Sequence, residues 1–448
     1  MAILDSGSAG CLSGTARVPG DKSISHRALI VSALAVGESR IDGLLEGADV
    51  LATAAALRAL GASIERTDAG AWSVHGTGIG GLAEPDTVLD LGNSGTAARL
   101  LLGVLGTHPL TATMTGDASL RTRPMGRVAE PLRAMGAVVS AREGGLMPLT
   151  VTGARDPVPI EYALPVASAQ VKSAILLAAL NTPGETTVIE PRRTRDHSEL
   201  MLRRFGVDIA VAERDGGRAI AVRGQPEISG RAVPVPGDPS SAAFPGIAAL
   251  LIPGSQVHIP GVGLNPTRTG LFDCLAEMGA AVAVERAETA EAEPVGDLTF
   301  SQPGKAGLRA IEVPADRAPR MIDEYPILAV AAAFAEGTTR MHGLGELRVK
   351  ESDRLAAIAG GLRAAGVGAA IEGDTLIVEG SGGRPAGGVA IDAAHDHRIA
   401  MAFLVLGLAC ERPIRVVGTE TIDTSFPGFA ATMNGLGAAI APVEDADA

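Results

Sequence analysis

Three residues in one short segment have side chains that could bind an anion and move a proton. Lys350 and Glu351 are adjacent, and Arg354 follows three residues later. If the segment is helical, Lys350 and Arg354 share a face, so that a dianion can bind both while Glu351 lies close enough to transfer a proton. A solvated helix face also carries charges at this spacing. The segment by itself therefore leaves both interpretations open.

A second candidate site runs from Pro19 to Arg27, with the sequence Pro-Gly-Asp-Lys-Ser-Ile-Ser-His-Arg. The Pro-Gly pair predicts a sharp turn, and Ser23 and Ser25 are candidate caps for the apolar helix that follows. The free N–H groups of that helix, with Lys22 and Arg27 beside them, predict an anion site. A capped helix with two surface cations would have the same sequence, so the motif alone does not decide between the two.

Several other segments place small residues, hydroxyls or cations before an expected apolar helix, where backbone N–H groups can bind an anion. They lie at 91–99, 116–125, 167–173, 194–198, 320–326 and 395–398. The spacing at 91–99 fits neither a Walker motif nor a dinucleotide fingerprint. His395 and His397 would point in different directions at a helix start, which argues against a metal pair.

The elements that must position these residues follow a repeat of roughly 70 to 90 residues. In each copy a predicted helix ends at Leu-x-x-x-Gly and is followed by a strand, a turn and another strand. The glycines of the six copies are Gly61, Gly136, Gly206, Gly279, Gly366 and Gly437. The repeat predicts six α/β units, three in each half of the chain.

A duplicated turn indicates where the two halves meet. Val-Pro-Gly-Asp occurs at 18–21 and again at 235–238, so we expect chain crossings near 19–22 and 235–240. The first domain is then 20–236, and the second combines 1–19 with 237–448. A chain of 448 residues also has the length of two domains rather than one.

Composition narrows the class of protein. The net charge of −13 argues against a general nucleic-acid surface, and no apolar run is long enough to span a membrane. The three cysteines are odd in number and far apart, and no signal peptide is recognisable, so we expect a cytoplasmic protein without a disulfide framework or zinc site. The chain has only four lysines, Lys22, Lys172, Lys305 and Lys350, and three of them lie in the motifs described above.

Taken together, the motifs resemble those of the 5-enolpyruvylshikimate-3-phosphate (EPSP) synthase family, particularly its bacterial class II branch. The resemblance covers nearly the whole chain. The motifs that carry it are Pro-Gly-Asp-Lys-Ser-Ile-Ser-His-Arg at 19–27, Gly-Asn-x-Gly-Thr at 92–96, Arg-Pro-Met at 123–125, Ser-Ala-Gln-Val-Lys at 168–172, Pro-Gly-Asp-Pro-Ser-Ser at 236–241, Lys-Glu-Ser-Asp-Arg at 350–354 and Asp-His-Arg at 396–398.

The resemblance implies an α/β fold of two similar domains, each an inside-out α/β barrel of three βαβαββ units. It implies transfer of the enolpyruvyl group of phosphoenolpyruvate to the 5-hydroxyl of shikimate 3-phosphate, with release of phosphate and without a metal or cofactor. The partners implied are these two small molecules, with no nucleic acid and no membrane, and we expect a monomer. Closure of the two domains would bring their cations together around two substrates that repel each other.

Site residues are carried over position by position. The catalytic residues implied are Lys22, Asp323 and Glu351, where Asp323 accepts the hydroxyl proton and Glu351 protonates the methylene carbon, with Lys22 a rival for the proton transfer. The residues implied to bind shikimate 3-phosphate are Lys22, Ser23, Arg27, Ser168, Ala169, Gln170, Arg195, Asp323 and Lys350. The residues implied to bind phosphoenolpyruvate are Lys22, Asn93, Gly95, Thr96, Arg123, Gln170, Arg354 and Arg398.

Three positions depart from the pattern of the family or vary within it. Ala169 replaces a second serine that many members have, and Thr424 occupies a position that is lysine in other branches. Gly95 is small where some herbicide-tolerant members have alanine. We therefore expect glyphosate, which mimics phosphoenolpyruvate, to fit this site.

Two other functions remain open at this point. UDP-N-acetylglucosamine enolpyruvyl transferase has a similar fold and donor, but that family usually has a reactive cysteine in the loop corresponding to 116–123, which has none here. A non-catalytic repeat protein that clamps nucleic acid would explain the repeats. The negative net charge, with cations gathered at the unit junctions, argues against it.

Overall fold

The computed structural model describes residues 2–214, 217–287, 293–302 and 307–443. The chain forms two compact units. Unit 1 comprises Met1–Pro19, Pro236–Glu288 and Pro294–Ala448, and unit 2 comprises Gly20–Val235 and Thr289–Glu293. The main crossings between the units thus fall at the two Val-Pro-Gly-Asp turns.

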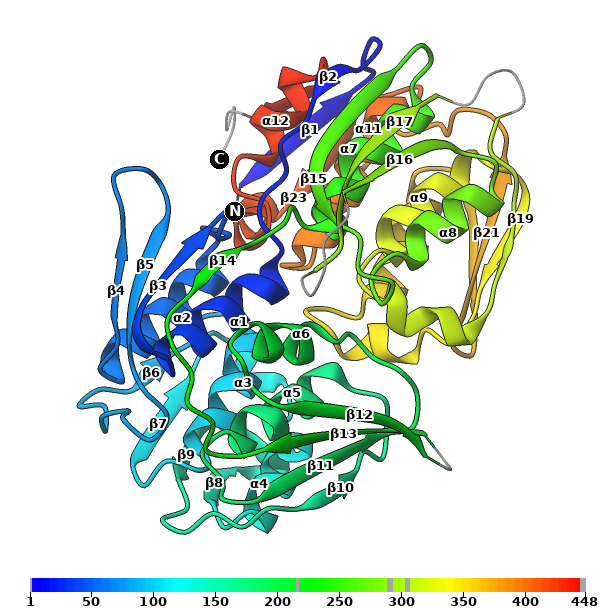
Figure 1. The fold of residues 1–448 in the computed structure, drawn as a ribbon. Coiled ribbons are helices and arrows are strands. Elements are labelled where there is room, and N and C mark those ends of the chain that lie inside the picture. Colours follow the sequence, from blue (N-terminus) through cyan, green and yellow to red (C-terminus); the bar gives the residue numbers. More distant parts are fainter. Residues whose placement is uncertain (1, 215–216, 288–292, 303–306, 444–448) are drawn as a thin grey trace. The chain divides into compact units, whose positions relative to one another are not determined.

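Unit 2 begins with the first of the buried helices (Figure 1). Its helices are α1 (Lys22–Ala33), α2 (Ala48–Ala59), α3 (Gly95–Leu105), η1 (Leu120–Thr122), α4 (Gly126–Ala134), η2 (Glu143–Gly145), α5 (Ala169–Ala179) and α6 (His197–Arg204). Its strands are β3 (Val36–Asp42), β4 (Ser63–Arg66), β5 (Trp72–Thr77), β6 (Leu89–Asp90), β7 (Thr111–Thr115), β8 (Val138–Arg142), β9 (Leu146–Thr152), β10 (Glu161–Ala163), β11 (Glu185–Glu190), β12 (Ile209–Arg214), β13 (Gly217–Arg223) and β14 (Ala232–Pro234).

Unit 1 contains both ends of the described chain. Its helices are α7 (Pro239–Leu251), α8 (Gly270–Glu277), η3 (Ala315–Arg320), α9 (Tyr325–Phe334), η4 (Gly345–Val349), α10 (Arg354–Ala364), α11 (His397–Ala409), η5 (Thr419–Thr424) and α12 (Phe429–Gly435). Its strands are β1 (Ile3–Gly7), β2 (Ser13–Thr15), β15 (Gln256–Gly263), β16 (Ala281–Ala287), β17 (Val295–Ser301), β18 (Glu312–Val313), β19 (Glu336–Met341), β20 (Gly368–Glu372), β21 (Thr375–Ser381), β22 (Ala390–Asp392), β23 (Ile414–Val417) and β24 (Ala439–Pro442).

The strands form six four-stranded mixed sheets with one common order. In the sheet β10-β11-β13-β12, a short edge strand pairs in parallel with the second strand, which pairs antiparallel with a hairpin. In four sheets the edge strand is followed in the chain by a helix and then by the second strand of the same sheet. The other two edge strands are exchanged, because β2 precedes α1 but pairs with β15, whereas β14 precedes α7 but pairs with β3. With this exchange, each sheet belongs to a βαβαββ unit. Three sheets borrow a strand from a distant part of the chain, because β14 completes the sheet of β3–β5, β2 completes the sheet of β15–β17, and β1 joins β23 and β24. The predicted α/β class is confirmed, and the described strands form separate sheets without closing into a hydrogen-bonded barrel.

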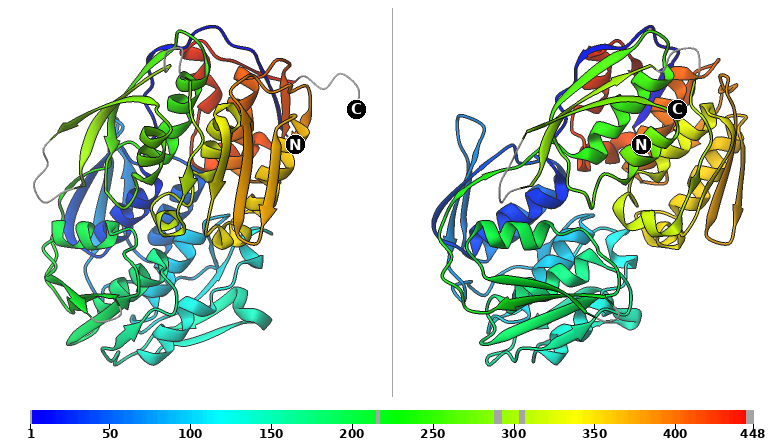
Figure 2. Two further views of the ribbon diagram at one scale, coloured as in Figure 1. Left: turned by 90° about the vertical axis from the view of Figure 1, so that its right-hand side faces the viewer. Right: turned by 45° about the vertical axis from the view of Figure 1, so that its right-hand side comes forward.

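Six helices, one for each βαβαββ unit, are almost entirely buried. These helices are α1, α3 and α5 in unit 2, and α7, α9 and α11 in unit 1. Beyond the polar residues of their N-terminal halves, their sequences are mainly apolar, as expected for helices surrounded by protein. The sheets lie outside them, and in Figure 2 the yellow-to-orange sheet of β18–β21 follows the outer side of the helices of unit 1. The two hydrophobic cores are built around these helices.

The six predicted glycines end helices as expected. Each has φ between +83° and +107°, the left-handed conformation that favours glycine after a helix. In five copies a side chain three positions before the glycine donates a hydrogen bond to the carbonyl three positions after it. The donors are Arg58 (to Ile64), Arg133 (to Val139), Arg203 (to Ile209), Arg363 (to Ala369) and Asn434 (to Ile440). The fourth copy has Ala276 at this position.

The single tryptophan lies in unit 2. Trp72 is 5% exposed, and its Nε1 donates to Glu46 Oε1 at 3.1 Å. The guanidinium carbon of Arg58 lies 5.9 Å from the ring centroid, which is within the range of a cation–π contact.

Candidate active site

The predicted site residues lie at the N-terminal ends of the buried helices. In unit 2, α1 begins at Lys22, and its N-cap is Asp21, whose Oδ1 accepts from Ile24 N at 2.9 Å. The prediction that Ser23 or Ser25 caps this helix is wrong. Asp21, two residues before Ser23, is the cap, and Ser25 Oγ instead accepts from Leu45 N at 3.0 Å. Lys22 is therefore the first residue of α1.

Arg27 joins three elements of unit 2 through hydrogen bonds. Its Nε donates to Ser198 Oγ and its Nη2 to Ser173 Oγ, both at 2.7 Å, while Nη1 donates to Ser23 O at 2.9 Å. Ser198 Oγ also donates to Ser173 Oγ at 2.7 Å. Burial lowers the pKa of Arg27 to about 10, opposed by the negative charge of Glu199. At neutral pH the guanidinium is therefore charged, fixed and only 4% exposed.

Lys22 is paired with a carboxylate that the sequence did not reveal. Its Nζ forms an ion pair with Asp49, which lies in the first turn of α2 and is 5% exposed. Asp49 thus neutralises the charge of Lys22.

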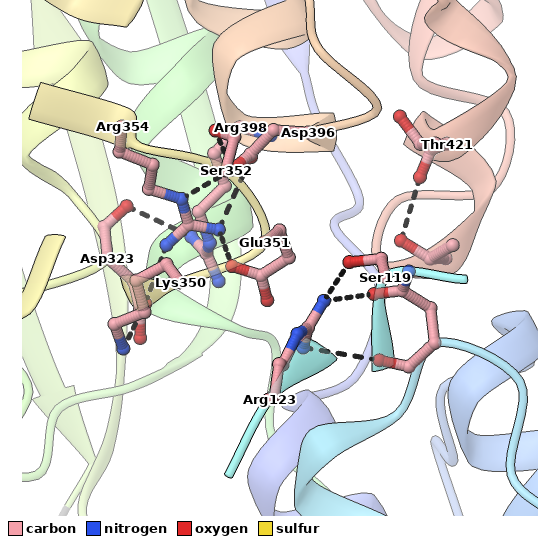
Figure 3. A network of polar contacts seen from close by, with 12 residues as sticks. Ser119, Arg123, Asp323, Lys350, Glu351, Ser352, Arg354, Asp396, Arg398 and Thr421 are labelled. Atoms are coloured by element: carbon pink, nitrogen blue, oxygen red, sulfur yellow. Dashed lines mark hydrogen bonds and ion pairs between the residues drawn. The ribbon is translucent and has the colours of Figure 1, made fainter. Parts of the chain in front are cut away.

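The Gly-Asn-Ser-Gly turn before α3 holds a second cation. Arg123 Nη2 donates to Asn93 Oδ1 at 2.7 Å and to Ser119 Oγ at 2.9 Å, as Figure 3 shows for Ser119. A Cβ at Gly95 would lie 3.2 Å from Arg123 Nη1 and 2.8 Å from Arg99 Nη1. Glycine at 95 therefore lets both guanidinium groups approach the start of α3.

Gln170 links the starts of α3 and α5. Its Nε2 donates to Thr96 Oγ1 at 3.1 Å, and its Oε1 accepts from Arg99 Nη1 at 2.8 Å. Ser168 is the N-cap of α5, and its Oγ accepts from Val171 N. Ala169 is the first residue of α5 and offers only its backbone N–H.

Arg195 lies half-buried in the loop between β11 and α6. The predicted site residues of unit 2 lie at or near the starts of helices, and we call them the α1/α3/α5 cluster. Its members are Lys22, Ser23, Arg27, Asn93, Gly95, Thr96, Arg123, Ser168, Ala169, Gln170 and Arg195. Hydrogen bonds join the starts of α3 and α5, and Arg27 joins α1 to α5, so the positive ends of three helices adjoin.

In unit 1, a buried arginine lies among three carboxylates (Figure 3). Arg354 Nη2 is 2.5 Å from Glu351 Oε2, Nη1 is 3.1 Å from Asp323 Oδ1, and Nε is 2.7 Å from Asp396 Oδ2. Burial opposes the charge of Arg354, but the three carboxylates outweigh it and raise the pKa above its usual value. Arg354 is thus permanently charged.

Lys350 and Arg354 do not share a helix face. Helix η4 ends at Val349 and α10 begins at Arg354, so residues 350–353 form a turn between two helices. Asp353 caps α10 and thereby sets its start. The two cations still converge, because Lys350 Nζ lies 3.4 Å from Asp323 Oδ1, the atom that Arg354 also contacts.

Arg398 lies in the first turn of α11. The N-cap of this helix is Asp396, which accepts from Arg398 N at 2.9 Å while binding Arg354. Arg398 Nη1 donates to Asp323 O at 3.3 Å. We call Asp323, Lys350, Glu351, Arg354 and Arg398 the α9/α10/α11 cluster.

The remaining candidates lie apart from these contacts. Thr424 ends η5, and its Oγ1 donates to Thr421 O at 2.7 Å. Lys305 lies outside the described residues. Within the described part of the chain, no three His, Cys, Asp or Glu side chains are grouped closely enough to hold a metal ion, and no helix there has the length and apolarity needed to cross a membrane.

Sequence reasoning missed four side chains that hold site residues in place. They are Asp49, Arg99, Ser198 and Asp396. Arg99, Ser198 and Asp396 lie in segments that the sequence singled out, but they were given no role. Asp396 is the N-cap of α11. The N-cap position at the start of an apolar helix is a local signal that could have identified it.

Six βαβαββ units with cations and two carboxylates at helix starts define an α/β enzyme that acts on small anions. Comparison with known proteins gives its family. The model of the family EPSP synthase (3-phosphoshikimate 1-carboxyvinyltransferase) matches residues 8–433. The chain therefore belongs to the EPSP synthase family, and it is a transferase.

Individual relatives are similar to this chain over nearly its full length. The 3-phosphoshikimate 1-carboxyvinyltransferase of Paramagnetospirillum magneticum is 61% identical over 438 residues, which cover 98% of each chain. That of Acidiphilium cryptum is 62% identical over 429 residues, or 96% of this chain and 95% of the relative. An EPSP synthase structure from Acinetobacter baumannii has a TM-score of 0.87 at 44% identity, covering 99% of this chain and 100% of that one.

Proposed function

We propose that the α1/α3/α5 and α9/α10/α11 clusters bind the two substrates of this transferase. The reaction moves the enolpyruvyl group of phosphoenolpyruvate to the 5-hydroxyl of shikimate 3-phosphate and releases phosphate, a step of the shikimate pathway. The observation that carries the assignment is the convergence of Asp323, Glu351 and Lys350 with Arg354, because the reaction needs both a proton acceptor and a proton donor beside cations.

Shikimate 3-phosphate is assigned mainly to the residues around Arg27. A fixed, charged guanidinium with hydroxyls and helix N–H groups beside it suits a phosphate dianion. The proposed ligands are Lys22, Ser23, Arg27, Ser168, Ala169, Gln170, Arg195, Asp323 and Lys350, with Ala169 contributing its backbone alone.

Phosphoenolpyruvate is assigned to Lys22, Asn93, Gly95, Thr96, Arg123, Gln170, Arg354 and Arg398. Its carboxylate must compete for Arg354 with carboxylates already present. Glu351 and Asp323 have side chains 20% and 13% exposed, whereas Asp396 is fully buried, so Glu351 is the one most easily displaced. A displaced Glu351 loses the cation that favours its ionised form and takes up a proton more readily. Binding of the donor would thus prepare Glu351 to protonate the methylene carbon, while Asp323 accepts the hydroxyl proton.

Two finer assignments belong to the same proposal. We place the chain in the bacterial class II branch on its Ser-Ala-Gln-Val-Lys and Lys-Glu-Ser-Asp-Arg motifs. We also expect glyphosate to inhibit it, because glycine at 95 leaves Arg123 and Arg99 close to the start of α3. Inhibition that is unchanged in Gly95→Ala would contradict this account of glyphosate binding.

The test is release of phosphate from phosphoenolpyruvate with either shikimate 3-phosphate or UDP-N-acetylglucosamine as acceptor. We expect release only with shikimate 3-phosphate, and a loss of about 10²- to 10⁴-fold in kcat for Glu351→Gln. Glu372→Gln is the control, because Glu372 is an exposed glutamate of β20. Release with the nucleotide sugar, or full activity in Glu351→Gln, would overturn the proposal.

A further inference from the structure

The reaction proposed above leaves one buried lysine without a role. Lys172 on α5 is fully buried, and its Nζ lies 3.0 Å from Glu190 Oε2 and 2.7 Å from Glu199 Oε1. Both glutamates are buried as well, with side chains no more than 2% exposed. We call Lys172, Glu190 and Glu199 the buried triad. Three charges in the interior are costly compared with apolar side chains, so packing alone does not account for them.

Two residues of the triad are next in sequence to the two serines whose hydroxyls accept from Arg27. Lys172 precedes Ser173 on α5, and Glu199 follows Ser198 on α6. The Lys172–Glu199 ion pair and the Ser198–Ser173 hydrogen bond thus join the same two helices by neighbouring residues. Any shift of α6 relative to α5 must break both contacts, so the ion pair fixes the position of Ser198.

The other carboxylate of the triad anchors the loop of Arg195. Glu190 is the last residue of β11, and its Oε2 accepts from Thr194 N at 3.2 Å and from Thr194 Oγ1 at 2.7 Å. Lys172 contacts the same oxygen. One ammonium therefore holds both the loop that presents Arg195 and the helix that presents Ser198.

The ion pairs of Lys172 with Glu190 and Glu199 explain why, among the described residues, the Arg27 guanidinium is not itself paired with a carboxylate. Its hydrogen bonds go only to hydroxyl and carbonyl oxygens, and within the described part of the chain no carboxylate lies in ion-pair distance of its guanidinium. Lys172 engages both nearby glutamates, and Arg218 on β13 approaches Glu190 Oε1 only to 4.0 Å. Glu199 still favours the charged form of Arg27 through space. The triad thus supports the charge of Arg27 without occupying its donors.

We propose that Lys172 is a positioning residue for shikimate 3-phosphate, which acts by fixing Arg195 and Ser198 through Glu190 and Glu199. The inference rests on the assignment of this substrate to the residues around Arg27. In this role Lys172 touches neither substrate and yet determines how well shikimate 3-phosphate binds.

The test compares Lys172→Met, Glu199→Gln and the double variant with the native enzyme. Met keeps the length of the lysine stem without its charge. We expect Lys172→Met to raise KM for shikimate 3-phosphate about tenfold and KM for phosphoenolpyruvate less than about twofold.

The double variant removes the repulsion between the two glutamates that Lys172→Met leaves behind. If both single variants fold, its KM for shikimate 3-phosphate should be lower than the product of the two single effects predicts. If Lys172→Met fails to fold, the double variant is compared directly with the native enzyme, and its KM should rise for shikimate 3-phosphate but less than about twofold for phosphoenolpyruvate. Glu161→Gln, which breaks the exposed pair with Arg214, is the control and should behave as the native enzyme does. Equal rises in KM for both substrates, or strictly additive effects, would overturn the role of Lys172.

One more variant separates this inference from the function on which it rests. Arg27→Met should abolish binding of shikimate 3-phosphate measured by calorimetry without phosphoenolpyruvate. Unchanged binding in Arg27→Met would overturn the substrate assignment itself. Loss of binding in Arg27→Met together with native KM values in Lys172→Met would overturn only the inference about Lys172.

Discussion

At the scale of single residues, Arg354 shows how a buried cation can be both fixed and available. Asp396 is fully buried and contacts Arg354 through two oxygens, with Nε at 2.7 Å and Nη2 at 3.3 Å. Asp323 and Glu351 are partly exposed. The first carboxylate holds the guanidinium in place. Under the proposed function, the substrate anion would displace one of the other two.

This division of roles predicts different effects for two substitutions of Asp396. Asn can still accept from Arg398 N and cap α11, but it lacks the charge that orients Arg354, whereas Ala removes both contacts. We expect Asp396→Asn to lower kcat/KM for phosphoenolpyruvate about 10- to 100-fold, as for a lost charge-assisted hydrogen bond. Its Tm should stay well above that of Asp396→Ala in thermal unfolding. Equal Tm values would show that the cap contributes nothing.

A buried histidine in unit 2 predicts a dependence of stability on pH. Burial, aided by Lys22 and Arg27, holds the pKa of His26 well below its usual value, which is about 6.5 in an unfolded chain. Above that pH both states are neutral. As the pH falls below 6.5, the unfolded chain gains a proton that the folded chain excludes, so stability decreases by up to about 1.4 kcal/mol per pH unit.

Replacing this histidine should flatten that dependence. Between pH 7.5 and 5.0, His26→Asn should lose less stability than the native protein in urea unfolding. Its Asn can replace the contact of Nδ1 with Thr53 Oγ1, which is 2.8 Å long. His75→Asn is the control, because His75 is exposed on β5, and it should retain the native dependence. A slope in His26→Asn as steep as the native slope would exclude His26 as its source.

At the scale of elements, the side chain that donates a hydrogen bond across the glycine turn in five of the six copies predicts a stabilising substitution in the remaining one. Five copies of the repeat tie the helix end to the following edge strand, and the fourth has the exposed Ala276 instead. An arginine there can reach Val282 O on β16, an edge strand of its sheet. Ala276→Arg should raise the free energy of unfolding by about 0.5–1 kcal/mol. Arg133→Ala should lower it by a similar amount, and urea unfolding measures both. A loss of stability in Ala276→Arg would contradict the equivalence of the copies.

The elements were predictable from sequence where the signal is local. A glycine after a Leu-rich helix, followed by β-branched residues, predicts a left-handed helix end and a strand, and all six positions were correct. The turn at 350–353 was missed because the charge spacing of a helix also fits a turn, and only the cap at Asp353 distinguishes them. The small and charged residues of 285–296 also predict an exposed loop. This prediction is wrong at both ends, because β16 and β17 extend into the segment. Its middle, 288–292, lies outside the described residues.

The site was predictable only in part, because its contacts join distant positions. The family motifs named the cations, but the carboxylates that hold them follow from the fold. Lys22 pairs with Asp49 from the next helix, and Arg354 with Asp396 from the next βαβαββ unit. Neither pairing has a periodicity that one sequence could reveal.

At the scale of the whole molecule, the duplicated turns carry the chain between its two units and have little room for side chains. A Cβ at Gly20 would lie 1.9 Å from the carbonyl oxygen of Gly43, a backbone atom that cannot move independently. Gly20→Ala should therefore lower Tm strongly or prevent folding. Gly126→Ala is the control, because nothing lies within 4 Å of its Cβ, and it should keep the native Tm. A native Tm in Gly20→Ala would show that the turn tolerates a side chain.

The place of Trp72 makes unit 2 optically distinct from unit 1. The chain contains one tryptophan and two tyrosines, so light absorbed at the red edge of the protein spectrum excites an indole that belongs to unit 2 alone. Its emission reports the polarity around Glu46 and Arg58, and it does not report on the core of unit 1. Comparing fluorescence with calorimetry during one unfolding experiment would therefore reveal, without any label, whether the two halves of this molecule melt together or in turn.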